Sequence, residues 1–163
     1  MTFTDVRKDP ATLTMSIATE WDAPIARVWA LWADPRKLER WWGPPTFPAT
    51  VLEHDLRPGG KVSYYMTSPE GEKHHGWWKV VAVEEPHRLD LEDGFADTDG
   101  VPDDTMPTTQ STVTFAELPS GATRMVIETR FPSREAMDQM IDMGMEEGMA
   151  AALGQIDAIL AGA

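Results

Sequence analysis

Two side chains of the sequence, His54 and Tyr64, have the types and spacing that general acid–base chemistry uses. His54 alternates with Leu52 and Leu56, the pattern of a half-buried strand, so we expect its ring to face the interior. Tyr64 falls on the next predicted strand and could be the partner of His54 or a hydroxyl donor to a ligand. Such a pair beside a reacting carbon is sufficient to move a proton. The alternative, that His54 is a hydrogen-bonded core residue, is the more frequent situation for a buried histidine.

Other motifs of catalysis and metal binding are absent from the sequence. His74, His75 and His87 fall in predicted turns or at a strand edge, where we expect them to be solvated. Cysteine is absent, which excludes thiol catalysis and cysteine-ligated zinc. The sequence has no G-x-S-x-G elbow, no H-E-x-x-H pair and no glycine-rich phosphate loop before a helix. We therefore expect no metal and no cofactor.

Length and charge narrow the classes of partner. The 163 residues carry a net charge of −13, which opposes the phosphate backbone and anionic lipid, so we expect no binding to nucleic acid or to a membrane surface. No apolar run reaches the roughly 20 residues of a membrane span. We expect one domain over residues 1–163, with a core of about 11–161, in the cytoplasm. The sequence leaves a homodimer open.

Hydrophobic periodicity predicts the elements that position these residues. A strand at Thr12–Trp21 precedes a helix with Ile25, Val28, Trp29 and Trp32 on one stripe, and Asp34 opens a second, short helix. Further strands are predicted at about 50–56, 61–67, 76–85, 88–92, 111–118 and 123–131, and hairpin-length connections favour an antiparallel sheet. An acidic loop covers Asp93 to Thr109, and one long helix runs from about Ser133 to about Ala161. The fold class is α+β with about seven strands.

Two adjacent tryptophans, Trp41 and Trp42, close the second short helix just before Gly43 and Pro44. Adjacent residues on a helix point about 100° apart, so the two indoles cannot easily share one pocket. We predict that Trp41 faces a cavity and that Trp42 packs in the core.

The apolar stripe of the last helix includes two glycines, Gly144 and Gly148, one turn apart. Each destabilises a helix by up to about 1 kcal/mol relative to alanine, so each needs a reason. One explanation is close approach of the sheet backbone, and the other is an apolar space that holds a small molecule. Ten methionines and seven tryptophans supply adaptable apolar surface for either arrangement.

Four segments carry a resemblance to a known family: Ala23–Pro45, Asp55–Val62, Glu84–Leu89 and Met143–Leu160. In these segments the chain resembles the START-like superfamily called SRPBCC, with its helix-grip fold, and within it the family named for the activator of the heat-shock-protein-ninety ATPase. The resemblance implies a curved antiparallel sheet wrapped on the C-terminal helix, two short helices closing one end, and a central cavity. Relatives elsewhere in the superfamily bind lipids or hormones, or cyclise polyketides. Family members often have tryptophan where this chain has Met149.

These observations lead to three hypotheses. The first is a cavity that binds a small apolar or amphipathic molecule, lined by Trp41, Phe47, His54, Tyr64, Trp78, Gly144, Met145 and Met149. The second is an enzyme of the polyketide cyclase or aromatase type, with His54 and Tyr64 as its acid–base pair. The third is an interaction module of the chaperone ATPase-activator type, which predicts an exposed apolar patch.

Overall fold

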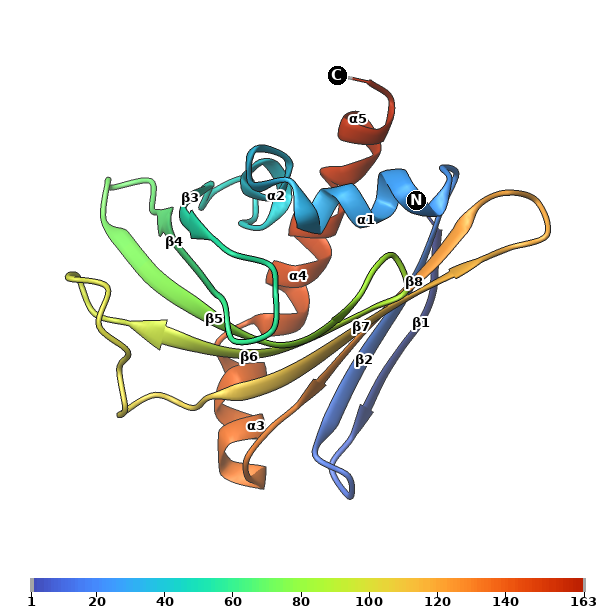
Figure 1. Cartoon of the computed structure of the whole chain (residues 1–163). Helices are drawn as coiled ribbons and strands as arrows, with labels where there is room; N and C mark the ends of the chain where they lie inside the picture. Colours follow the sequence, from blue (N-terminus) through green and yellow to red (C-terminus); the bar gives the residue numbers. More distant parts are fainter. Residues whose placement is uncertain (1, 163) are drawn as a thin grey trace.

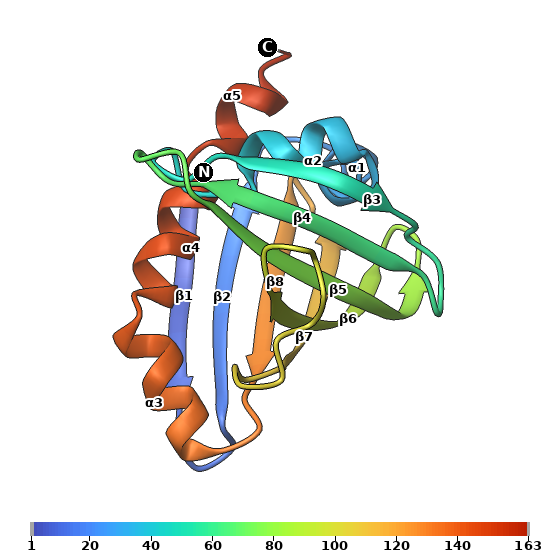
Figure 2. The same cartoon turned by 90° about the vertical axis from the view of Figure 1, so that its left-hand side faces the viewer.

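A curved antiparallel sheet and a set of helices on its concave side form the fold, as the computed structural model shows for residues 2–162 (Figures 1 and 2). The strands are β1 (Thr2–Asp9), β2 (Thr14–Trp21), β3 (Ala49–His54), β4 (Lys61–Thr67), β5 (Lys73–Glu84), β6 (Arg88–Ala96), β7 (Thr109–Glu117) and β8 (Thr123–Arg130). The helices are α1 (Ile25–Ala33), α2 (Pro35–Trp41), α3 (Arg134–Asp142), α4 (Met145–Leu153) and α5 (Ile156–Leu160). This arrangement is the expected helix-grip fold.

The sheet has the strand order β1-β2-β8-β7-β6-β5-β4-β3, with antiparallel pairing throughout. It contains eight strands among the described residues, one more than expected, and it begins at residue 2, ahead of the predicted core boundary. The additional strand, β1, is an edge strand whose Val6 is 40% exposed. Its run of charged residues hides the alternation on which strand prediction depends.

The two helices after β2 close one end of the sheet, as predicted (Figure 1). The predicted stripe of α1 is buried, and Asp34 caps α2 by accepting a hydrogen bond from the backbone N–H of Arg36 at 2.9 Å. Ser133 likewise caps α3 by accepting from the N–H of Ala136 at 3.0 Å. Among residues 2–162, none of the helices has the length and hydropathy that crossing a membrane requires.

The predicted long C-terminal helix is divided into α3, α4 and α5, which follow one another along the concave side of the sheet (Figures 1 and 2). The first break lies at Gly144, whose φ of 91° is in the left-handed region that favours glycine. A residue in this conformation ends one hydrogen-bonded ladder and starts another, so Gly144 is a helix junction and not a mid-helix residue as predicted. The second break lies between Leu153 and Ile156.

Two strands differ from the prediction in ways that affect the site. β6 continues through Asp93 to Ala96, so the acidic loop begins only after Ala96. In β3 the register shifts between Val51 and Glu53. This bulge turns Leu52 outward, where it is 56% exposed, so the prediction that Leu52 shares the inner face is wrong.

The core between the helices and the sheet is rich in tryptophan. The rings of Trp32 and Trp41 meet edge to face at a centroid separation of 4.9 Å, and those of Trp42 and Trp78 do so at 4.8 Å. Gln155, between α4 and α5, donates a hydrogen bond from Nε2 to the carbonyl of Gly43 at 2.6 Å. The end of α2, which carries the paired indoles, is thereby fixed to the C-terminal helices.

Candidate functional site

An apolar hollow of about 290 Å³ lies between α4 and the inner face of the sheet. Its floor and sides combine the end of α2, the inner side chains of β4 and β6, and the α3–α4 junction. The wall residues are Trp42, Pro44, Met66, Phe95, Met140, Met143, Gly144, Met145, Gly148, Met149 and Ala152. Because methionine side chains are flexible and polarisable, such a wall adapts to ligands of different shape.

The hollow opens into a wider mouth of about 770 Å³, which shares Pro44, Met66, Phe95 and Met143 with it. Phe47 lines this mouth, where its ring lies 5.9 Å from the ring of His74. The other mouth residues come from β5 and from the loop after β6. A ligand can therefore enter beside the acidic loop.

A deep end of about 100 Å³ adjoins the hollow and shares Phe95, Met140 and Met145 with it. Three polar side chains line it, namely Tyr64, Asp93 and Thr109. They come from three strands, β4, β6 and β7. The three adjoining spaces thus form a passage with an apolar middle, while polar side chains line its mouth and its deep end.

Tyr64 reaches the deep end because β5 has a glycine at the crossing point. Gly76 is the register partner of Tyr64, and a Cβ at Gly76 would stand 2.5 Å from the Tyr64 ring and hydroxyl. Any side chain there would displace the ring, since real Cβ atoms do not approach other atoms so closely. Gly76 therefore lets the phenol lie across β5, toward Asp93 on β6.

The Asp93 carboxyl is the ionisable group of the deep end. The residue is half-buried, and its carboxyl lies among apolar side chains, so burial raises the pKa of Asp93 to about 7. Burial, followed by the negative charge of Asp93, raises the pKa of the Tyr64 phenol above its usual range. The phenol is therefore neutral, while Asp93 exchanges a proton near neutral pH.

Two indole N–H groups, those of Trp42 and Trp78, lie near the Tyr64 hydroxyl. The N–H groups of Trp42 and Trp78 lie near enough to the Tyr64 hydroxyl to lower its pKa slightly. Neither N–H makes a hydrogen bond of ordinary geometry with any described residue, although both nitrogens are buried. Both N–H groups therefore face the oxygen of Tyr64, and neither indole lines the deep end itself.

The structure brings together most of the predicted site residues. Tyr64 lines the deep end, Phe47 lines the mouth, and Gly144, Met145 and Met149 line the central hollow. Their role in binding stays a prediction.

The assignment of the two adjacent indoles is wrong. Trp41 is fully buried and donates from Nε1 to the carbonyl of Leu31 at 2.9 Å, whereas Trp42 lines the hollow. Trp78 is also fully buried and lines none of these hollows, so it affects the site only through its N–H group beside the Tyr64 hydroxyl.

His54 and Tyr64 are not brought together. Across the β3–β4 pair His54 stands opposite Val62, while Tyr64 stands opposite Val51. The half-buried His54 ring places Nε2 at 2.9 Å from the carbonyl of Trp32 and lines none of the hollows described above. This is the hydrogen-bonded packing role that was the alternative in the sequence.

The sequence did contain a signal for Asp93 that the prediction missed. Leu89, Leu91, Asp93 and Phe95 alternate along β6, so an acidic residue occupies an inward position of an otherwise apolar row. Placing the end of the strand before Asp93 hid this pattern. No such signal identifies Trp42, because the helix period separates the two indoles without fixing the rotation of α2.

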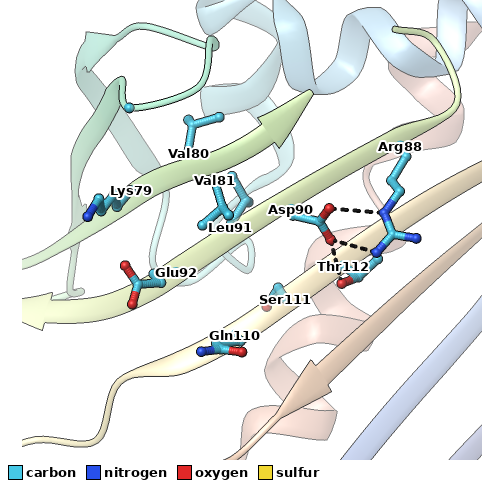
Figure 3. A pocket seen from close by; sticks show the side chains of 11 residues that line it. Lys79, Val80, Val81, Arg88, Asp90, Leu91, Glu92, Gln110, Ser111 and Thr112 are labelled. Atoms are coloured by element: carbon cyan, nitrogen blue, oxygen red, sulfur yellow. Dashed lines mark hydrogen bonds and ion pairs between the residues drawn. The ribbon is translucent and has the colours of Figure 1, made fainter. Parts of the chain in front are cut away.

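A second hollow, of about 620 Å³, lies on the outer face of β5, β6 and β7 (Figure 3). Two of its charged groups, Arg88 and Asp90, already form an ion pair with each other. Asp90 accepts from Nε of Arg88 at 3.0 Å and from the hydroxyl of Thr112 at 2.7 Å. We therefore place the candidate site in the inner passage. Within the described part of the chain, no cluster of histidine and carboxylate side chains is arranged to hold a metal ion.

Comparisons with known proteins agree with this architecture. The family model described as activator of Hsp90 ATPase homolog 1-like protein matches residues 22–161. The crystal structure of protein Ms6760 from Mycobacterium smegmatis is 49% identical, covers 98% of this chain and 97% of that one, and gives a TM-score of 0.90. A solution structure from Arthrobacter aurescens is 50% identical, with coverage of 99% and 94% and a TM-score of 0.94.

A more distant solution structure, from Staphylococcus epidermidis, is 27% identical, with coverage of 95% and 92% and a TM-score of 0.83. No curated protein matches the sequence closely enough to count as a relative.

Proposed function

This chain belongs to the family of activator of Hsp90 ATPase homolog 1-like proteins, and on that premise we propose that it binds a small apolar or amphipathic molecule between α4 and the sheet. The observation that carries the proposal is the passage itself. An apolar hollow with methionines on its wall, open at one end and polar at the other, has the composition of a preformed small-molecule site.

Gly148 supports this function. A Cβ built at Gly148 meets no atom within 4 Å, so the glycine faces open space and not the sheet backbone. Of the two explanations for a helix glycine, close approach of the sheet is thus unsupported at this position. The missing side chain leaves room for a ligand.

The other two hypotheses receive less support. An acid–base pair of His54 and Tyr64 requires both groups in one cavity, and His54 is instead bonded to the carbonyl of Trp32. An interaction module requires a contiguous apolar patch, but the exposed large apolar side chains lie on separate segments: Val6, Leu52, Val81, Val101 and Met143.

The test is binding of three ten-carbon probes, 1-decanol, decanoate and decylamine, measured by native mass spectrometry and by tryptophan fluorescence. We expect at least one probe to bind with a stoichiometry of one. Gly148→Leu fills the hollow and should weaken binding at least about tenfold, equivalent to ~1.4 kcal/mol.

Ala151→Leu is the matched control, because it adds the same side chain at an exposed position of α4. It should leave binding unchanged. If no probe binds the unmodified chain, or if Gly148→Leu binds as well as Ala151→Leu does, the proposed function is wrong.

A further inference from the structure

The polar groups of the deep end lack partners within the described chain, and this is the starting point for identifying the ligand. The hydroxyl of Tyr64 faces the N–H groups of Trp42 and Trp78 and finds no acceptor for its own hydrogen among the described residues. Among residues 2–162, no hydrogen bond or ion pair reaches the buried carboxyl of Asp93. A buried polar group without a partner destabilises the fold, and folded proteins keep few of them.

The groups are also separated from one another. The charge of Asp93 acts on Tyr64 through space, without a hydrogen bond between the two side chains. Both nevertheless line the same space of about 100 Å³. A gap therefore lies between one donor, the Tyr64 hydroxyl, and one acceptor, the Asp93 carboxylate.

We propose that this gap binds a hydroxyl group, so that the ligand is a neutral alcohol or phenol whose apolar body lies along the methionine wall. This inference rests on the proposed function. The ligand oxygen accepts a hydrogen bond from the Tyr64 hydroxyl, and the ligand hydroxyl donates its hydrogen to Asp93. A hydroxyl group is both donor and acceptor, as the two sides of the gap require.

Charged head groups fit the gap less well. A carboxylate would accept from the donors but would place a second negative charge beside Asp93 in apolar surroundings. An ammonium group would pair with Asp93 but would offer no acceptor to the Tyr64 hydroxyl. Either choice leaves part of the deep end unsatisfied.

The ranking of the three ten-carbon probes at pH 8 tests this inference, since their chains are the same and only the head group differs. We expect 1-decanol to bind about tenfold more tightly than decanoate and decylamine. A preference for decylamine would assign the site to a cation, and a preference for decanoate would assign it to an anion. Either result, or equal affinity for all three, overturns the inference.

Two variants locate the head group. Tyr64→Phe removes a hydrogen-bond donor and should weaken the binding of 1-decanol about fivefold. Asp93→Asn removes the charge and should reduce the preference for 1-decanol over decanoate. Their controls, Tyr65→Phe and Glu92→Gln, change the adjacent outward side chains of the same strands and should alter neither quantity.

The two proposals fail in different ways. If no probe binds, the proposed function itself is wrong. If probes bind and Gly148→Leu blocks them, but the head groups rank differently or Tyr64→Phe and Asp93→Asn leave the ranking unchanged, only the hydroxyl inference is wrong.

Discussion

The phenol of Tyr64 on β4 lies over Gly76 on β5, with its hydroxyl 2.5 Å from the position of a Cβ at that glycine. One residue type on the middle strand thus decides whether a side chain of β4 can reach the carboxyl of Asp93 on β6. A glycine at an inward strand position would otherwise weaken the sheet. Gly76 is best explained as part of the site.

Gly76→Ala should therefore destabilise the chain by about 1–3 kcal/mol, because the methyl group forces the Tyr64 ring out of its position. Urea unfolding gives the free energy. In a Tyr64→Ala background the same substitution should have a much smaller effect, since the ring is gone. Equal effects in both backgrounds would contradict the proposed contact.

Asp93 should make stability depend on pH. Burial raises its pKa to about 7 in the folded chain from its ordinary value of 3.8, so the folded state binds more protons between these values and stability falls as pH rises from about 4 to about 7. Asp93→Asn should remove this loss. At pH 8 the variant should be more stable by up to about 4 kcal/mol, at ~1.36 kcal/mol per pKa unit, and by far less at pH 4.

Unfolding curves at the two pH values measure the difference. Glu92→Gln serves as the control, because Glu92 lies on the outer face of the same strand. If Asp93→Asn raises the free energy of unfolding by the same amount at both pH values, the carboxyl is not desolvated.

The two glycines of the C-terminal helices should respond to alanine with opposite signs. Gly144→Ala places a Cβ at a φ of 91° and should destabilise by about 1 kcal/mol or more. Gly148→Ala meets no atom within 4 Å in a regular helix and should stabilise by about 0.5–1 kcal/mol. Thermal unfolding of both variants checks the pair.

Substitution of the two adjacent indoles should have different effects on probe fluorescence and on stability, because the two side chains lie in different surroundings. Trp42→Phe should abolish most of the fluorescence change on probe binding, because Trp42 lines the hollow. Trp41→Phe should retain that change but lose stability, since it removes a buried hydrogen bond to Leu31 and leaves a cavity. The reverse result would restore the original sequence-based assignment.

Much of the fold could be predicted from the sequence, because local patterns determine it. The stripe of α1 and the caps at Asp34 and Ser133 depend on neighbouring residues, and all three are found as expected. The site was predicted less completely. Asp93 was assigned to a loop, and the break at Gly144 was taken for a mid-helix position.

These errors share a physical cause. Whether a strand continues through a residue such as Asp93 depends on pairing with β5 and β7, which is distant in sequence. Leu52 was misplaced for a related reason, since the register shift in β3 turns it outward while His54, opposite the buried Val62, still faces inward. Local alternation does not contain that information.

The register shift in β3 also has a consequence for association between molecules. Both edge strands carry a register shift, between Phe3 and Asp5 in β1 and between Val51 and Glu53 in β3. A bulge interrupts the row of free N–H and C=O groups that another strand would need for pairing. The open sheet is thereby protected at each edge against continuous extension by a second copy, and so against edge-to-edge aggregation.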